Sequence, residues 1–272
     1  MSKVQVLVTT MHQKDFSKYS EMNLQTDAVI ANQADREFVE ETEINNSNVK
    51  LITTTTRGLS KNRNISISNI SDDAQYIMFS DDDLQFHNGY ESIIVKEFEQ
   101  NPMADAIKFN LNCISKRQLS MKPITQFKKV GRKEVTSFGV CGLVIKKDVL
   151  LSKGLKFNER FGTGTDNYCG EDSIFLQKVI KKGINLYVSP KFIADIDQSE
   201  TSWFEGYTEK FFTVGGMVIN ECYPILSFAL VLRSAIKAYK RGKTDLSFLE
   251  ILKCYYKGIL KNISERKMRS VK

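Results

Sequence analysis

The chain has 272 residues, 42% of them apolar and 26% charged, so it is long enough to bury a sizeable core. Five scattered cysteines without CxxC spacing argue against a zinc site or a disulfide framework, and two histidines exclude a multi-histidine metal site. No apolar run is long enough to span a bilayer, and no signal peptide is expected before the first strand. We therefore expect a folded protein with reduced thiols in the cytoplasm.

Charge is unevenly distributed along the chain. The whole chain carries a net charge of +7, whereas residues 233–272 hold 12 Lys and Arg against 3 Asp and Glu, a net of +9. Residues 1–232 therefore come to a net charge of −2. The net positive charge is therefore a property of the C-terminal segment, and any role for it has to be sought there.

Strands and helices are predicted to alternate in the first part of the chain. Apolar, β-branched runs predict strands at Lys3–Thr10, Asp27–Ala31, Val49–Thr55, Gln75–Ser80 and Ala106–Leu111. Helices are expected at His12–Met22, after Arg57 as far as Ser68 with Ser60 as N-cap, and at Tyr90–Gln100. This alternation predicts an α/β fold with a largely parallel sheet, in which ligands bind at the carboxyl ends of the strands.

The second part of the chain is less regular. Residues 118–134 are polar and basic and are expected to form a loop or hairpin. The pattern that follows predicts a strand at Phe138–Ile145, a short helix at Lys146–Ser152, a glycine-rich loop at Phe161–Gly170, a helix at Glu171–Ile180 and a strand at Ile184–Val188.

Three consecutive acids, Asp81, Asp82 and Asp83, follow the fourth predicted strand. Each carboxylate disfavours ionisation of its neighbours, so such a cluster is costly unless a cation compensates it. Oxygen ligands at a strand end suit Mg²⁺ or Mn²⁺, which also bind substrate phosphates. A polar turn after a buried strand is the alternative interpretation of the same residues.

A second acidic pair, Glu171 and Asp172, follows the glycine-rich loop. Both residues fall in the first turn of a predicted helix, where the helix dipole stabilises carboxylates. The functional alternative is a carboxylate that a loop holds at the site as a general base.

Several segments occur in a characteristic order: RGLSKNRN (57–64), YIMFSDDDL (76–84), CGLVIKKDVL (141–150), and GLKFNERFGTG followed by GEDSIFLQKVIKKG (154–164 and 170–183). With the first two strands and their polar ends, they resemble the family 2 glycosyltransferases with the GT-A fold. The second half more specifically resembles bacterial enzymes that build capsular and surface polysaccharides. The resemblance covers about residues 3–215 and implies a GT-A domain at 1–220, with a mostly parallel central sheet flanked by helices, and a basic, helical C-terminal extension at 221–272.

The resemblance also implies how a nucleotide-sugar, most simply a UDP-sugar, is bound. Donor-binding residues would be Thr9, Asn32, Asp35, Arg57, Arg63, Asp81 and Asp82. Asn32 and Gln33 stand where the family usually has an acidic pair. Asp83 would coordinate Mn²⁺ or Mg²⁺, with Asp81 beside it and with Asp195 at the position of a metal-binding histidine in many relatives.

The implied chemistry is inverting transfer of a sugar to a saccharide. Asp172 would be the catalytic base, with Glu171 as the nearest alternative, and would take the proton of an acceptor hydroxyl. Trp203, the one tryptophan, would contact the acceptor, although it could equally be a core residue. A nucleotidyltransferase acting on sugar phosphates and a catalytically inactive binding protein are the alternative functions.

The C-terminal segment interleaves apolar and basic residues from Tyr223 onwards. Such helices can lie on an anionic membrane, which would place the enzyme on the inner face of the cell membrane beside a lipid-linked acceptor. They can instead pack on the domain or on a second copy of the chain. No nucleic-acid-binding motif accompanies the charge, so nucleic acid is not expected as a partner.

Overall fold

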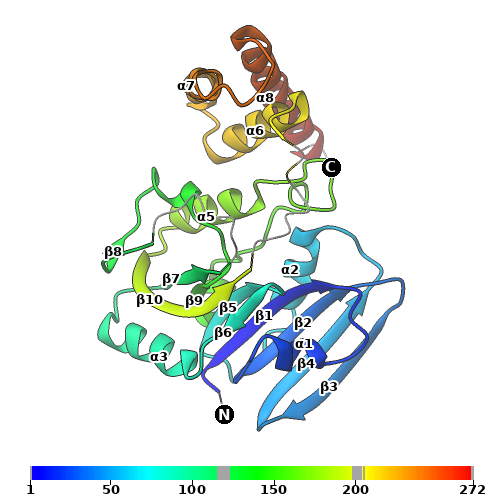
Figure 1. The fold of residues 1–272 in the computed structure, drawn as a ribbon, viewed down its shortest axis with the longest axis vertical. Helices are drawn as coiled ribbons and strands as arrows, with labels where there is room; N and C mark the ends of the chain where they lie inside the picture. The colour runs from blue at the N-terminus through cyan, green and yellow to red at the C-terminus, as the bar shows by residue number, and fades with distance from the viewer. Residues whose placement is uncertain (1, 115–122, 198–203, 205, 271–272) are drawn as a thin grey trace.

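A ten-stranded mixed sheet forms the centre of the computed structural model, which describes residues 2–114, 123–197, 204 and 206–270 (Figure 1). The strand order is β3-β4-β2-β1-β5-β9-β7-β10-β6, and β8 pairs with β10. The strands are β1 (Val4–Met11), β2 (Asp27–Gln33), β3 (Phe38–Ile44), β4 (Ser47–Thr54), β5 (Tyr76–Asp81), β6 (Leu84–Phe86), β7 (Ala106–Cys113), β8 (Lys128–Lys129), β9 (Leu143–Lys146) and β10 (Leu186–Ile196).

Strands β4, β2, β1 and β5 are parallel neighbours, so their carboxyl ends meet at one edge of the sheet. Their register pairs Thr9 with Asp81 across β1 and β5, and Thr10 with Asn32 across β1 and β2. Residues far apart in the sequence are thereby brought to a single edge. This confirms the expected α/β fold and the expected position of the polar strand ends.

The remaining strands are mostly antiparallel. Strand β9 runs antiparallel to both β5 and β7, β10 is parallel to β7, and the short β6 pairs antiparallel with β10. The predicted strand at Phe138–Ile145 starts only at Leu143, because residues 141–142 form a turn in which the Cys141 thiol bonds to Asp81 at the carboxyl end of β5. The predicted strand at Ile184–Val188 is longer and continues to Ile196.

Strand β3 was not expected from the sequence. Most of its side chains are exposed and three of them are glutamates, so it lacks the apolar alternation of a half-buried strand. It forms a hairpin with β4 through Asn45 and Asn46, both of which have positive φ angles. Asparagine tolerates that conformation, and a two-residue loop with positive φ matches the twist of the two strands.

Helices cover both faces of the sheet: α1 (Ser17–Glu21), α2 (Leu59–Ile67), α3 (Tyr90–Gln100), the 3₁₀ turn Val135–Ser137, α4 (Lys147–Ser152) and α5 (Glu171–Lys181). Side chains of β1 alternate between two cores: Val4, Val6 and Val8 enter one, and Leu7 enters the other. The expected helix at His12–Met22 is shorter because His12 has a positive φ and Gln13 hydrogen-bonds to Asn32.

The N-terminus of α2 differs from the prediction. The N-cap is Gly58, with φ of 114°, and no side chain caps the helix. Ser60 lies inside the first turn, and its buried hydroxyl donates to the Phe161 carbonyl oxygen at 2.6 Å. The Leu59 N–H in turn donates to the Thr163 carbonyl at 2.9 Å. The start of α2 is therefore held by the glycine-rich loop, whose position a local pattern cannot reveal.

The C-terminal helices α6 (Glu209–Cys222), α7 (Ser227–Lys240) and α8 (Phe248–Ser270) form a third layer beyond α5 (Figure 1). They share their own apolar core, which includes Phe212, Val231 and Ile259. The boundary expected at residue 220 falls near the end of α6, which packs against both α5 and α8, and the boundary stays a prediction. None of the described helices has the length and apolarity needed to cross a bilayer.

Helices α6 and α8 approach each other through glycines. A Cβ at Gly216 would lie 2.1 Å from the Tyr255 carbonyl oxygen, and a Cβ at Gly258 would lie 1.9 Å from the Thr213 carbonyl oxygen. The obstructing atoms belong to the backbone, so neither clash can be relieved by a side-chain rotation. The two helices can keep this distance only with glycine at both positions.

We predict that Gly258→Ala lowers the free energy of unfolding by about 1–3 kcal/mol, because the helices must separate to admit a methyl group. Chemical denaturation with the circular dichroism of the helices as readout measures the change. Gly131→Ala is the matched control, since a Cβ there meets no atom within 4 Å. Equal stability of the two variants would contradict the close packing of α6 on α8.

Candidate active site

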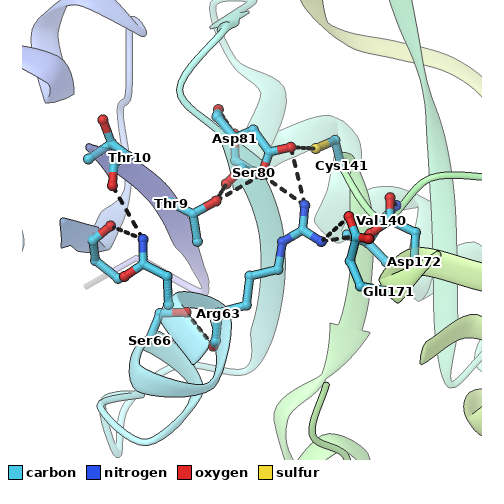
Figure 2. A network of polar contacts seen from close by, with 12 residues as sticks. Thr9, Thr10, Arg63, Ser66, Ser80, Asp81, Val140, Cys141, Glu171 and Asp172 are labelled. Carbon is cyan, nitrogen blue, oxygen red and sulfur yellow. Dashed lines mark hydrogen bonds and ion pairs between the residues drawn. The ribbon is translucent and has the colours of Figure 1, made fainter. Parts of the chain in front are cut away.

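A buried arginine, Arg63 of α2, occupies the centre of the site at the carboxyl edge of the sheet (Figure 2). Only 3% of its side chain is exposed. One terminal nitrogen donates to Asp172 Oδ1 at 2.6 Å, and the other donates to Asp81 Oδ1 and Oδ2 at 2.9 and 3.2 Å. Arg63 therefore joins the end of β5 to the beginning of α5, which are the two acidic motifs of the sequence.

Asp81 at the end of β5 has a full set of hydrogen-bond donors. Besides Arg63, the Thr9 hydroxyl donates to Oδ1 at 2.8 Å and the Cys141 thiol donates to Oδ2 at 3.1 Å. Burial alone would raise the pKa of Asp81, but the Arg63 charge and these hydrogen bonds outweigh it and hold the pKa below its usual value. Asp81 is thus a fixed carboxylate.

Asp82 and Asp83 differ in how far neighbouring groups offset their negative charge. Asp82 Oδ2 accepts a hydrogen bond from the Thr10 hydroxyl at 2.5 Å. For Asp83, desolvation, followed by the charges of Asp81 and Asp82, raises the pKa to about 7. Its carboxylate therefore faces negative charge that the described side chains leave uncompensated. A bound cation would remove this penalty.

The carboxylate oxygens of the site suit a divalent cation that is also coordinated by a bound ligand. Among the described residues no cluster of three or more Asp, Glu, His or Cys side chains could hold a metal by itself. Mg²⁺ and Mn²⁺ commonly bind through one or two carboxylates, with the remaining positions filled by water and substrate phosphate oxygens. Asp83 suits that kind of site, whereas both oxygens of Asp81 already accept hydrogen bonds from other side chains.

Asp195, the third expected metal ligand, is engaged elsewhere. Its Oδ1 accepts from the Asn112 amide at 2.8 Å and lies 3.1 Å from His87 Nε2, and these two hydrogen bonds lower its pKa. In the ladder of β6 and β10, Asp195 lies opposite Gln85. The residue beside Asp83 is Asp197, whose N–H donates to the Asp83 carbonyl oxygen at 3.2 Å and whose charge acts on the Asp83 carboxyl.

Asp172 and Glu171 begin α5 directly after Gly170, which has a φ of 96°. Asp172 Oδ2 accepts from the Val140 N–H at 3.1 Å, while Oδ1 is bonded to Arg63. Glu171 Oε2 is buried without a hydrogen-bond partner. Burial, then the neighbouring Asp172 charge, raises the pKa of Glu171 to about 7, although Arg63 opposes the shift. The two donors therefore fix the orientation of the Asp172 carboxylate, whereas Glu171 is a carboxyl that resists ionisation.

The other expected donor-binding residues lie at the same edge but are mostly bonded to protein atoms. Asn32 is fully buried, and its amide bonds to the Gln13 backbone and the Thr53 hydroxyl. Asp35 and Arg57 form an ion pair of 2.5 Å in the exposed loops above the strands. Trp203, the expected acceptor contact, lies outside the described residues.

Two residues at the site were not expected from the sequence. Cys141 contacts Asp81 directly, and burial raises the pKa of its thiol well above the usual value, so it donates a hydrogen bond as a neutral thiol. Lys108 of β7 is buried, which lowers the pKa of its amino group to about 8, while the charges of Cys141 and Asp172 oppose the shift. A lysine within the apolar run of β7 was the available signal.

The chain is similar to one protein family and to several solved structures. Residues 30–150 match the family model of the family 2 glycosyl transferases. The crystal structure of S. aureus TarS 1-349 in complex with UDP-GlcNAc matches with a TM-score of 0.61 and 15% identity, over 80% of this chain and 66% of that chain. The complex of TarS 1-349 with UDP matches with a TM-score of 0.60 and 14% identity, over 89% and 72%.

The chain spans 39% of the longer S. aureus TarS structure, with a TM-score of 0.59 and 14% identity over 80% of this chain. The comparison with curated protein sequences gave no match. The family match and the shared architecture confirm the resemblance to family 2 glycosyltransferases and the GT-A fold predicted from the motifs.

We predict that replacing Glu171 with Gln stabilises the fold more at pH 8 than at pH 5, by about 1–3 kcal/mol. A native pKa of about 7 means that the folded state keeps a proton that the unfolded state releases above its ordinary pKa of 4.5. The contribution of Glu171 to wild-type stability therefore falls as the pH rises from about 4.5 to about 7, and the variant lacks that loss.

Urea unfolding of both proteins at the two pH values gives the comparison. Glu99→Gln, at an exposed glutamate of α3, controls for the loss of a negative charge. A stabilisation by Glu171→Gln that is independent of pH would show that Glu171 ionises as it does in the unfolded chain.

Proposed function

We propose that the chain transfers a sugar from a UDP-sugar to a saccharide hydroxyl with inversion at the anomeric carbon. The observation that carries this proposal is the bridge from Asp81 through Arg63 to Asp172, which unites the expected donor-binding motif with the expected base. The crystallised TarS fragment binds UDP-GlcNAc and UDP within the same fold, which makes UDP-GlcNAc the first donor to test.

In the proposed reaction Asp172 takes the proton of an acceptor hydroxyl. The hydroxyl oxygen forms a bond to the anomeric carbon of the donor from the face opposite the nucleotide, and the bond from that carbon to the diphosphate breaks, releasing UDP. The Val140 N–H and Arg63 hold one oxygen of Asp172 each, which fixes the direction of its carboxylate.

The donor end of the site would be organised by Asp83 and Asp81, with Asp197 as a further candidate. A divalent cation bound there would offset the negative charge that develops on the leaving diphosphate. Thr9 and Thr10 set the orientation of Asp81 and Asp82 through their hydroxyl groups. Thr9, Thr10 and Asp81 lie on the carboxyl ends of β1 and β5, and a site built on strands is held more precisely than one built on loops.

We predict that Asp83→Ala and Asp172→Asn separate binding from transfer. Asp83→Ala removes a metal ligand, so Mn²⁺-dependent binding of UDP-GlcNAc should fall by about a hundredfold or more. Asp172→Asn should leave binding nearly unchanged while the transfer rate falls by about a hundredfold or more, because the amide cannot accept the acceptor proton.

Titration calorimetry against UDP-GlcNAc with and without Mn²⁺, and release of UDP in the presence of acceptor saccharides, measure the two effects. Asp35→Ala, in the exposed ion pair with Arg57, tests whether that peripheral pair contributes to donor binding. Full transfer activity of Asp172→Asn would remove Asp172 as the base. A folded wild-type protein that binds no nucleotide-sugar in either condition would refute the proposed donor.

We further propose that the helical extension attaches the enzyme to an anionic membrane, beside a lipid-linked saccharide acceptor. Exposed apolar side chains line both outer helices: Phe228, Leu232, Ile236 and Tyr239 of α7, and Leu249 and Leu260 of α8. The groove along α8 also contains Lys253 and Lys257. Apolar contacts flanked by cations suit the interface of an anionic bilayer, where each cation contributes about 1 kcal/mol.

We predict that Leu249→Glu combined with Lys253→Glu releases the protein from vesicles that contain phosphatidylserine. The changes remove an exposed apolar contact and invert one charge, without touching the core that α8 shares with α6. Co-sedimentation with anionic and with neutral vesicles measures the loss. Val39→Glu, at an exposed apolar residue of the distant strand β3, is the matched control. Sedimentation of the double variant with anionic vesicles at the wild-type level would refute this face as the attachment surface.

A further inference from the structure

The side chain of Arg63 is buried among protein atoms, unlike that of an arginine exposed to bind a ligand. Its side chain is 97% buried, and the guanidinium lies against the Phe157 ring with its carbon 5.1 Å from the ring centroid. Both terminal nitrogens are bonded to carboxylates on the two sides of the site. The hydrogen-bonding capacity at the end of this side chain is directed to the protein's own acids.

The helix that carries Arg63 is fixed at the residues on either side of it. Asn62 donates to the Ala31 carbonyl at the end of β2 at 2.8 Å. Asn64 donates to the Phe157 carbonyl and accepts from the Phe157 N–H. The backbone around Arg63 is thereby attached to the sheet on one side and to the loop before α5 on the other, so the guanidinium is preorganised between them.

The guanidinium of Arg63 is surrounded by more negative than positive charge. Asp81 and Asp172 are in direct contact with it, and a Glu171 oxygen lies 4.0 Å from it. Asp82 and Asp83 follow directly on the chain and add further negative charge. In the described part of the site Lys108 is the other basic side chain whose charge acts on Asp172, and its amino group donates to the Phe109 carbonyl. Arg63 is thus the cation that contacts both acidic motifs.

We propose that Arg63 is a positioning residue that acts as a shared counter-ion of Asp81 and Asp172, and is not a ligand of the donor. It fixes the positions of the two carboxylates relative to each other. Its positive charge also weakens the binding of a divalent cation as long as no diphosphate is present. The cation then binds productively together with the negatively charged donor. The inference rests on the proposed function of the site, but its physical test does not need the reaction.

The two roles for Arg63 lead to different results when its charge is removed. A donor ligand replaced by an apolar residue would weaken UDP-GlcNAc binding at saturating Mn²⁺, whereas a positioning residue replaced in the same way would not. A shared counter-ion replaced in the same way leaves the acidic cluster with one positive charge fewer. Because Coulomb interactions in a protein site are only partly screened, its affinity for a divalent cation must then rise.

The experiment is titration calorimetry of Mn²⁺ alone into wild type and Arg63→Met, at about pH 8, where carboxylates are ionised. We expect the variant to bind Mn²⁺ about tenfold more tightly or better. The matched control is Arg160→Met, which removes another buried arginine, one paired with Glu221 and Glu265 between the loop and the C-terminal helices. That control should lose stability without gaining Mn²⁺ affinity.

An unchanged or weaker affinity of folded Arg63→Met for Mn²⁺ would overturn the proposal. A gain of equal size in Arg160→Met would overturn it as well, because the effect would then be a general consequence of losing a buried arginine. Failure of wild type to bind any nucleotide-sugar would refute the proposed function and leave the Mn²⁺ comparison intact. The two failures are therefore distinguishable.

Arg63→Lys provides a second test if Arg63→Met does not fold. Lysine keeps the charge but has one nitrogen, so it cannot bond to both carboxylates in the geometry of the guanidinium. We expect Mn²⁺ affinity within about threefold of wild type. UDP release should show a lower kcat and an unchanged KM for the donor, since Asp172 has lost its orientation. Wild-type kcat in this variant, or a rise in KM alone, would contradict the positioning role.

Discussion

The ion-paired guanidinium of Arg63 is the interaction on which the arrangement of the site depends. A buried cation is tolerated only when its charge is paired and its hydrogen bonds are made, and the same holds for the carboxylates that it contacts. Asp81 and Asp172 are 91 positions apart in the sequence, and each supplies what Arg63 requires. The end of β5, the middle of α2 and the start of α5 therefore have to assemble together, because none of these segments contains both Arg63 and its two carboxylates.

The glycine-rich loop before α5 connects this cluster to the C-terminal helices. Its start accepts hydrogen bonds from Ser60 and Leu59 at the beginning of α2. Its end at Gly170 lies against α6, where a Cβ would come within 2.3 Å of Val218. Arg160, just before the loop, pairs with Glu221 of α6 and Glu265 of α8. The helical layer thus supports the loop that precedes α5 and its Asp172, and the extension is a structural part of the site's surroundings.

Local sequence patterns were sufficient for most elements of the sheet. Apolar runs of β-branched residues identified β1, β2, β4, β5 and β7, and amphipathic spacing identified α3 and α5, because these patterns directly report which face of an element is buried. They were insufficient for β3, whose side chains are largely exposed, and for the start of α2, which is fixed by a loop about one hundred residues away.

The sequence by itself determined which residues carry charge and at which strand or helix ends they stand. Only the tertiary structure decided their partners. Arg63 faces Asp81 and Asp172 instead of solvent, Asn32 holds a backbone loop, and Asp197 lies beside Asp83 where Asp195 had been expected. The physical reason is that burial and long-range hydrogen bonds set the role of a polar side chain, and both depend on segments that are distant along the chain.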